Sequence, residues 1–232
     1  MPEVLQTFTI KRRLYPPDAI PWALLLIESN VQRLRERYKF KLLTQELDPN
    51  GVVARLSGAS GEFSTSNGLQ AIQQLIIEPA VLHAQISGGS DVADGFVGDL
   101  VEALSEIGNS RILPETPEIT STYQTIAIAK LRLPSELLFS EKLRTYLNED
   151  VKPKLVLPDG EPEIRLQSLS WGVRYKMEST DFHYLPKLIT IEPRQGSRPS
   201  DMIYYTVSPT DSKTHLELLN KLESRFGQQG SV

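Results

Sequence analysis

Hydrophobic and polar positions alternate along residues 4–15, at the start of the chain. Phe8, Ile10 and Leu14 share one face of this segment, with Arg12 among them. The opposite face is polar or basic and carries Thr7, Thr9, Lys11 and Arg13. Period-two alternation with β-branched residues predicts a half-buried strand.

Further segments have apolar residues at helical spacing. Four helices are predicted, over residues 19–37, 91–107, 135–149 and 211–226. In the first, Leu24, Ile27 and Val31 belong to one apolar face. Ser90 is the expected N-cap of the second helix, and Gly108 its expected C-terminal stop.

Short strand-like runs separated by turn residues lie between these helices. They predict strands at 39–47, 51–58, 70–78 and 80–87, and in the second half at 122–133, 153–157, 162–178, 186–193 and 201–208. Asp48-Pro49-Asn50-Gly51 and Pro158-Asp159-Gly160 are turn signals. A short helix remains the alternative for 70–78. The stretch from Ser57 to Gly68 is interpreted as a strand connection, because the Lys-Ser/Thr of a phosphate-binding loop does not follow it.

The order of elements repeats. Gln6-Thr7 and Gln124-Thr125 open similar strands, while Ile77-Glu78-Pro79 and Ile191-Glu192-Pro193 close later ones. An internal repeat constrains the architecture of the whole chain. The predicted organisation is a first β-α-β4-α module at 1–108, a linker at 109–121, a second module at 122–227 and a tail at 228–232.

The predicted fold class is therefore α+β, a tandem duplication with pseudo-two-fold symmetry. Consecutive strands with short connections imply antiparallel sheets, and helices are expected on one face of them. This order of elements resembles the TATA-binding saddle and, more loosely, the helix-grip ligand-binding domains. The resemblance is one of topology alone and implies no activity.

The two first strands differ on one face. Where the first strand has Thr7, Thr9, Lys11 and Arg13, the second has a small and apolar set. This second-half face consists of Thr125, Ala127, Ala129 and Leu131. Such a face is either covered within the molecule or used to bind a partner.

Composition narrows the chemistry. The 232 residues are 40% hydrophobic and 23% charged, with a net charge of -4 and no cysteine. Disulfides, thiolate catalysis and Cys-ligated metals are excluded. The three histidines lack metal-ligand spacing, and no nucleophile elbow or dinucleotide-binding glycine pattern occurs. No cofactor and no metal are predicted, and a non-enzymatic role is favoured.

Basic residues are concentrated in the first half. The candidate binding residues are Lys11, Arg12, Arg13, Arg33, Arg37, Lys39 and Lys41. Cations near a helix C-terminus complement the helix dipole, so a solvated helix end explains several of them. The alternative is a docking patch for an acidic partner or for nucleic-acid phosphates.

Three functional hypotheses remain. The leading one is a non-enzymatic binding or assembly protein, such as an accessory subunit acting through sheet faces or edges. The second is nucleic-acid binding through a curved sheet, which the net negative charge disfavours. The third is a small-molecule groove, for which Trp22, Trp171, Tyr204 and Tyr205 are the candidate lining residues.

The expected partner is therefore a protein, with nucleic acid and a second copy of the chain as further possibilities. The N-terminal sequence Met1-Pro2-Glu3-Val4 lacks a basic segment followed by an apolar one. The longest apolar run, Trp22 to Ile27, is far shorter than a membrane span. A cytoplasmic protein with no membrane partner is expected.

Overall fold

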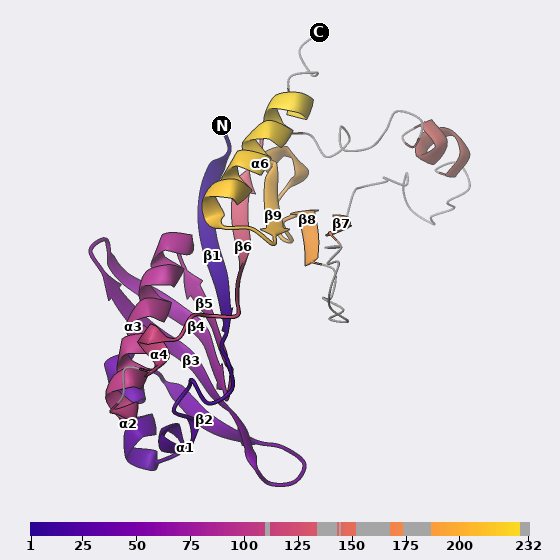
Figure 1. Ribbon diagram of the computed structural model, residues 1–232. Coiled ribbons are helices and arrows are strands. Elements are labelled where there is room, and N and C mark those ends of the chain that lie inside the picture. The colour runs from indigo at the N-terminus through magenta and orange to yellow at the C-terminus, as the bar shows by residue number, and fades with distance from the viewer. Residues whose placement is uncertain (110–111, 134–142, 144, 152–167, 174–186, 228–232) are drawn as a thin grey trace. The chain divides into compact units, whose positions relative to one another are not determined.

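The protein has an α+β fold with one antiparallel sheet. A computed structural model describes residues 1–109, 112–133, 143, 145–151, 168–173 and 187–227 (Figure 1). Nine described strands are hydrogen-bonded in the order β2-β3-β4-β5-β1-β6-β9-β8-β7. The predicted fold class is confirmed at this level.

The chain divides into two compact units. We call Thr7–Thr125 with Pro209–Lys213 the N-terminal unit. The C-terminal unit consists of Met1–Gln6, Ile126–Ser208 and Thr214–Val232. The predicted module boundaries at 108 and 122 stay a prediction.

Up to residue 130, the described part of the chain contains four helices and six strands. They are β1 (Glu3–Leu14), α1 (Trp22–Leu25), α2 (Glu28–Arg37), β2 (Leu42–Leu47), β3 (Val53–Thr65), β4 (Gly68–Glu78), β5 (Val81–Ser87), α3 (Ser90–Gly108), α4 (Ile112–Glu115) and β6 (Thr120–Lys130). In the N-terminal unit, α2, α3 and α4 lie on the same side of the sheet (Figure 1). The core between these helices and the sheet includes Leu56, Ile72, Leu75, Phe96 and Leu100, all completely buried.

The first predicted helix is interrupted. Residues 19–37 contain two helices, α1 and α2, because Ile27 has an extended backbone with ψ of 125°. The Asn30 side chain donates to the carbonyl of Leu24 at 2.8 Å and holds this junction. Leu24 and Ile27 are exposed whereas Val31 is buried, so the prediction that they share one continuous face was wrong. Val31 is buried as predicted.

The glycine-rich stretch is strand, and its prediction as a connection was wrong. β3 continues to Thr65 and pairs directly with β4, which begins at Gly68. The helix-side face of β3 needs glycine because an aromatic ring packs on it. A Cβ atom at Gly61 would lie 2.5 Å from a ring carbon of Phe40. The local composition is thus explained by close packing, and residues 70–78 are strand.

The helix predicted at 91–107 is confirmed as α3, but both predicted caps were wrong. The N-cap position is Gly89, and no side chain caps the helix there. The C-cap is Asn109, whose φ of 45° lies in the left-handed region. Asparagine tolerates this conformation better than most residues, which explains why the helix extends through Gly108.

The C-terminal unit contains a smaller described set of elements. They are η2 (Tyr146–Val151), β7 (Leu169–Val173), β8 (Lys187–Pro193), η4 (Pro199–Asp201), β9 (Ile203–Ser208) and α6 (Ser212–Phe226), whose first two residues belong to the N-terminal unit. The buried apolar cluster of this unit is Ala129, Leu131, Leu133, Ile191, Tyr204 and Leu219. The strand predicted at 153–157 and most of the helix predicted at 135–149 lie outside the described residues.

Candidate functional site

The first strand turns its polar face toward the helices. Thr9 and Lys11 are 0% and 3% exposed, whereas Phe8 and Ile10 on the other face are partly exposed. The alternation predicted from sequence is confirmed, but the buried face is the polar one. Thr9 donates to the carbonyl of Gly88 at 3.0 Å and so satisfies its hydroxyl in the interior.

Lys11 is held by groups from α3 and β6. Its Nζ lies 3.0 Å from Oδ1 of Asp94 and 3.8 Å from the ring centroid of Tyr123. The Tyr123 hydroxyl donates to the same carboxylate at 2.6 Å. Burial, followed by this bond to Asp94, raises the pKa of Tyr123. The ammonium is thus compensated by one carboxylate and one aromatic face.

The two neighbouring arginines of β1 have separate surroundings. Arg13 on the helix side forms an ion pair with Glu118, with 3.0 Å between Nε and Oε2. Arg12 lies on the opposite face, exposed, and is the cross-strand partner of His83. Burial, together with the charge of Arg12, lowers the pKa of His83. The three consecutive basic residues therefore do not form one basic surface.

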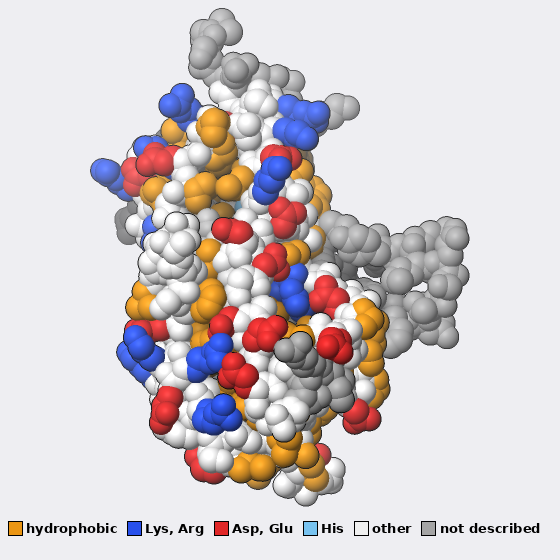
Figure 2. Space-filling view, turned by 60° about the vertical axis from the view of Figure 1, so that its left-hand side comes forward, with side chains coloured by type: hydrophobic (Ala, Val, Ile, Leu, Met, Phe, Trp, Pro, Cys, Tyr) orange, Lys and Arg blue, Asp and Glu red, His pale blue; other side chains and the backbone are white. Residues whose placement is uncertain are grey.

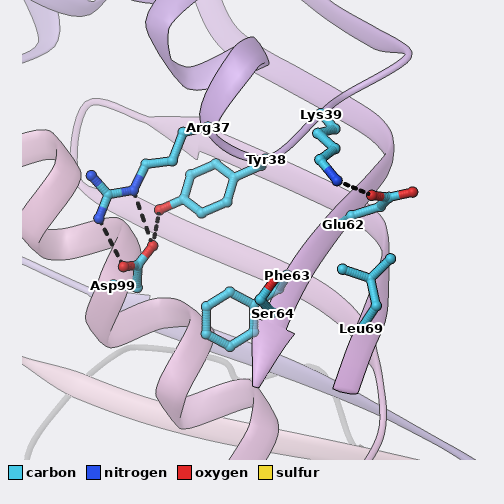
Figure 3. Close-up of a pocket in the computed structure, with 8 residues that line it drawn as sticks. All are labelled: Arg37, Tyr38, Lys39, Glu62, Phe63, Ser64, Leu69 and Asp99. Carbon is cyan, nitrogen blue, oxygen red and sulfur yellow. Dashed lines mark hydrogen bonds and ion pairs between the residues drawn. The ribbon is translucent and has the colours of Figure 1, made fainter. Parts of the chain in front are cut away.

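A shallow cavity of about 220 Å³ lies on the helix side of the N-terminal unit (Figure 3). Residues from the end of α2, from α3 and from the β3–β4 hairpin surround it. They are Arg37, Tyr38, Lys39, Glu62, Phe63, Ser64, Leu69 and Asp99. Two of the predicted basic residues, Arg37 and Lys39, therefore meet here.

The chain turns sharply where α2 ends at this cavity. Tyr38 is buried, and its carbonyl accepts the Glu62 amide at 2.7 Å. Lys39 follows with φ of 48°, a left-handed conformation that costs free energy for a residue with a Cβ atom. The turn directs Lys39 outward between the buried side chains of Tyr38 and Phe40.

Asp99 is the centre of the polar contacts in the cavity. Arg37 donates to it from Nη2 at 2.8 Å and from Nε at 3.2 Å, and the Tyr38 hydroxyl donates at 2.7 Å. Burial acts to raise the pKa of Asp99, but the bonds from Arg37 and Tyr38 outweigh it and the pKa is lowered. Burial, and then the bond to Asp99, raises the pKa of Tyr38.

These contacts leave little capacity for an anionic ligand. Arg37 also pairs with Glu106 at 3.3 Å, and Lys39 pairs with Glu62 at 3.0 Å. The two cations face three carboxylates, those of Asp99, Glu106 and Glu62. Charge complementarity therefore does not favour phosphate or nucleic acid at this cavity.

The remaining basic candidates are dispersed. Arg33 and Lys41 are exposed, and no residue in the described part of the chain forms an ion pair with either of them or with Arg12. On the surface drawn in Figure 2, basic and acidic side chains are interspersed. The structure does not bring the seven predicted basic residues together.

The second-half face lies in the interior. Thr125, Ala127, Ala129 and Leu131 are completely buried. Ala129 and Leu131 pack in one cluster with Leu219 of α6. Of the two alternatives that the sequence left open, cover within the molecule is the one observed.

A polar cluster on β9 and α6 was not predicted from the sequence. His215 is 2% exposed, with Nδ1 2.7 Å from the Ser208 hydroxyl and Nε2 2.9 Å from the Thr206 hydroxyl. Thr206 donates its own proton to the carbonyl of Ala127 at 3.0 Å. Nε2 is therefore the protonated nitrogen, and Nδ1 accepts from Ser208. Burial lowers the pKa of His215 to about 4.

The side of the N-terminal sheet without helices carries two rows of cross-strand neighbours. One row is Arg12, His83, Ile76, Ser57 and Thr44. The other is Ile10, Gln85, Gln74, Ala59 and Leu42. We call these residues the helix-free face; each is partly or fully exposed. The sequence pattern gave no signal for this surface, because the cross-strand register that brings these residues together is not visible in the sequence.

Other chemistry is limited in the described part of the chain. No group of three or more His, Asp or Glu side chains there is arranged to hold a metal ion. Among the described helices, none is long and apolar enough to cross a membrane. No family model, curated protein or solved structure matches this chain.

Proposed function

We propose that this is a non-enzymatic binding protein that docks a protein partner on the helix-free face. The observation that carries the proposal is the composition of that face. Arg12 is its only formally charged residue, because burial and the charge of Arg12 lower the pKa of His83. Depletion of charge at the centre of a surface is typical of the cores of protein interfaces.

Apolar and amide side chains make up much of the rest of the face. Ile10 and Ile76 lie on the inner strands β1 and β4, and Leu42 on the edge strand is 62% exposed. Gln74 and Gln85 are cross-strand neighbours whose side-chain amides carry both donors and acceptors, and Gln85 already donates from Nε2 to Gln73. A surface of this kind gains free energy by excluding water and can still satisfy a partner's polar groups.

A charged rim flanks one end of the face. Glu46 and Arg55 are cross-strand neighbours joined by an ion pair of 2.5 Å, and Glu78 lies at the end of β4. A polar rim around a less charged centre is the usual anatomy of a protein interface. Nucleic acid is the weaker alternative, since several unpaired cations would be needed to bind phosphates.

We also propose that the two halves are copies of one module. Two equivalent bonds support this: Thr9 donates to Gly88 at 3.0 Å and Thr125 donates to Thr210 at 2.8 Å. Each acceptor stands two residues before the serine that begins α3 or α6. Those serines, Ser90 and Ser212, have hydroxyls 3.1 Å apart within the N-terminal unit.

These bonds match Thr9 with Thr125, whereas the sequence pattern matched Thr7 with Thr125. The two correspondences differ by two residues along the first strand. Counting from Thr9 and Thr125, Lys11 corresponds to Ala127. Counting from Ser90 and Ser212, Asp94 corresponds to Leu216. The charged pair of the first copy thus stands where the second copy has apolar residues. Conversely, the buried histidine of the second copy, His215, corresponds to the apolar residue Ala93 of the first copy. Under this proposal each copy has acquired its own buried polar group.

Two substitutions on the same strand test the docking proposal. Ile76→Asp places a charge at the centre of the helix-free face, while Leu69→Asp places one in the shallow cavity, where Leu69 is 56% exposed. Circular dichroism first shows that each variant is folded. Each variant is then purified from its native cells together with the proteins that remain bound to it. We expect Ile76→Asp to lose the partner protein and Leu69→Asp to keep it. Loss with Leu69→Asp alone would assign binding to the cavity instead.

A further inference from the structure

The buried surface of α6 contains titratable side chains. Its buried residues are His215, Leu219 and Glu223, which follow each other at four-residue spacing on one stripe of the helix. The eight buried residues of α3 are all apolar. α6 is therefore attached to its sheet by a surface whose polarity depends on pH, whereas α3 is not.

Two hydroxyl groups contact the nitrogen atoms of the His215 ring. On β9 its neighbours are Thr206 and Ser208, and Thr206 connects it to the carbonyl of Ala127 on β6. Lys213 and Glu217 are exposed and, two positions away on the helix, do not share its face. Asp211, one turn before it, is only partly exposed. Burial accounts for the lowered pKa of His215, and no charge within the described part of the chain contributes to this shift.

Glu223 is the second titratable contact. Its Oε1 accepts the backbone N–H of Arg132 at 2.7 Å, and its Oε2 lies 3.0 Å from the amino group of Met1. Burial acts to raise the pKa of Glu223, but these bonds outweigh it and the pKa is lowered. Both side chains therefore bind protons less tightly in the folded state than in an open one.

We propose that α6 is an acid-released cover, which mild acid loosens from β6 and β9 by protonating His215. The surface uncovered is the apolar face of Ala127, Ala129 and Leu131, now buried. Protonation of buried histidine in mild acid is a general means of switching a packed interface of this kind. This inference does not depend on the helix-free face of the N-terminal unit.

The expected size of the effect follows from His215. The stability that it contributes is complete above pH 6.5 and is lost as the pH falls from 6.5 toward 4. Between pH 7.4 and pH 5.0 the equilibrium constant for opening α6 rises about 30-fold, for a pKa of 6.5 in the open state and about 4 in the folded state. Glu223 adds to the effect only at lower pH.

Hydrogen exchange of the full chain tests the proposal. Exchange of residues 212–226 is measured at pH 7.4 and 5.0 and corrected for the intrinsic rate, with residues 90–108 of α3 as the internal control. We expect the opening constant of α6 to rise about 30-fold and that of α3 to change little. An equal change in both helices, or none in α6, overturns the proposal.

A non-titrating variant separates His215 from other groups. His215→Gln keeps a donor for Thr206 and an acceptor for Ser208 but carries no charge between pH 7.4 and 5.0. We expect its α6 opening to be independent of pH over this range, and an unchanged response overturns the proposal. If this variant does not fold, NMR of the native His215 ring decides: a neutral ring at pH 5.0 supports the proposal, and a protonated ring contradicts it.

Discussion

The ion pair between Lys11 and Asp94 provides the sharpest test of the energetics, because its two partners differ in burial. The Lys11 side chain is 4% exposed, whereas that of Asp94 is 42% exposed. Asp94→Asn therefore leaves a buried ammonium without its charge partner, while Lys11→Met leaves a carboxylate that water can reach. The two single substitutions should differ in cost although they break the same pair.

Removing one partner of a buried pair costs about 3–5 kcal/mol in general. We reduce this to about 2 kcal/mol for Asp94→Asn, because the amide oxygen still accepts from Lys11 and the site is close to solvent. Lys11→Met, which keeps most of the side-chain volume, should cost about 1 kcal/mol or less. The double variant should be more stable than Asp94→Asn alone, because its methionine needs no carboxylate.

Urea unfolding followed by circular dichroism at pH 7 measures these differences. Lys39→Gln is the matched control, because Lys39 and Glu62 form a pair at the same 3.0 Å distance with side chains 68% and 41% exposed. It should cost less than about 0.5 kcal/mol. The reasoning is refuted if Asp94→Asn costs no more than Lys39→Gln, or if the double variant is the least stable of the set.

Three further predictions concern the N-terminal unit. Gly61→Ala should destabilise this unit by about 1–3 kcal/mol, because the new methyl group meets the buried Phe40 ring. Gly98→Ala in α3 has open space around its Cβ atom and should stabilise the unit by about 0.5 kcal/mol. Thermal unfolding of the two variants measures this difference. Tyr38→Phe should cost about 1 kcal/mol of stability, because it removes a hydrogen bond to Asp99. Loss of this bond should also raise the pKa of Asp99, which NMR titration measures. An unchanged pKa would contradict the assigned network. Arg12→Gln should raise the pKa of His83 toward its ordinary value without restoring it, because burial remains; a fall in that pKa would be the opposite of what the structure implies.

Much of the fold was predictable because hydrophobic period is a local property. The alternation in β1 and the helical spacing in α3 are correct, and both depend only on neighbouring residues. Some errors arose where a distant residue decides the local structure, and others where a single local contact interrupts the hydrophobic pattern. Gly61 is in a strand because Phe40 packs on it, and the α1–α2 break depends on Ile27 and Asn30.

The candidate site was less predictable, for a related reason. The sequence places Lys11, Arg12 and Arg13 side by side, yet only the positions of Asp94 and Glu118 show that two of them are paired. A strand whose buried face is polar contradicts the usual rule, and its compensation comes from another element. The helix-free face likewise depends on five strands being in register.

The central claim is that the helix-free face contacts a protein partner, and site-specific photocrosslinking in native cells tests it most directly. A photoreactive residue is placed at Gln74 on this face and, as the control, at Glu102 on the exposed side of α3; both positions are exposed. The account predicts a discrete, protease-sensitive adduct from Gln74 and none of comparable yield from Glu102. A nuclease-sensitive adduct from Gln74, or equal adducts from the two positions, would contradict it.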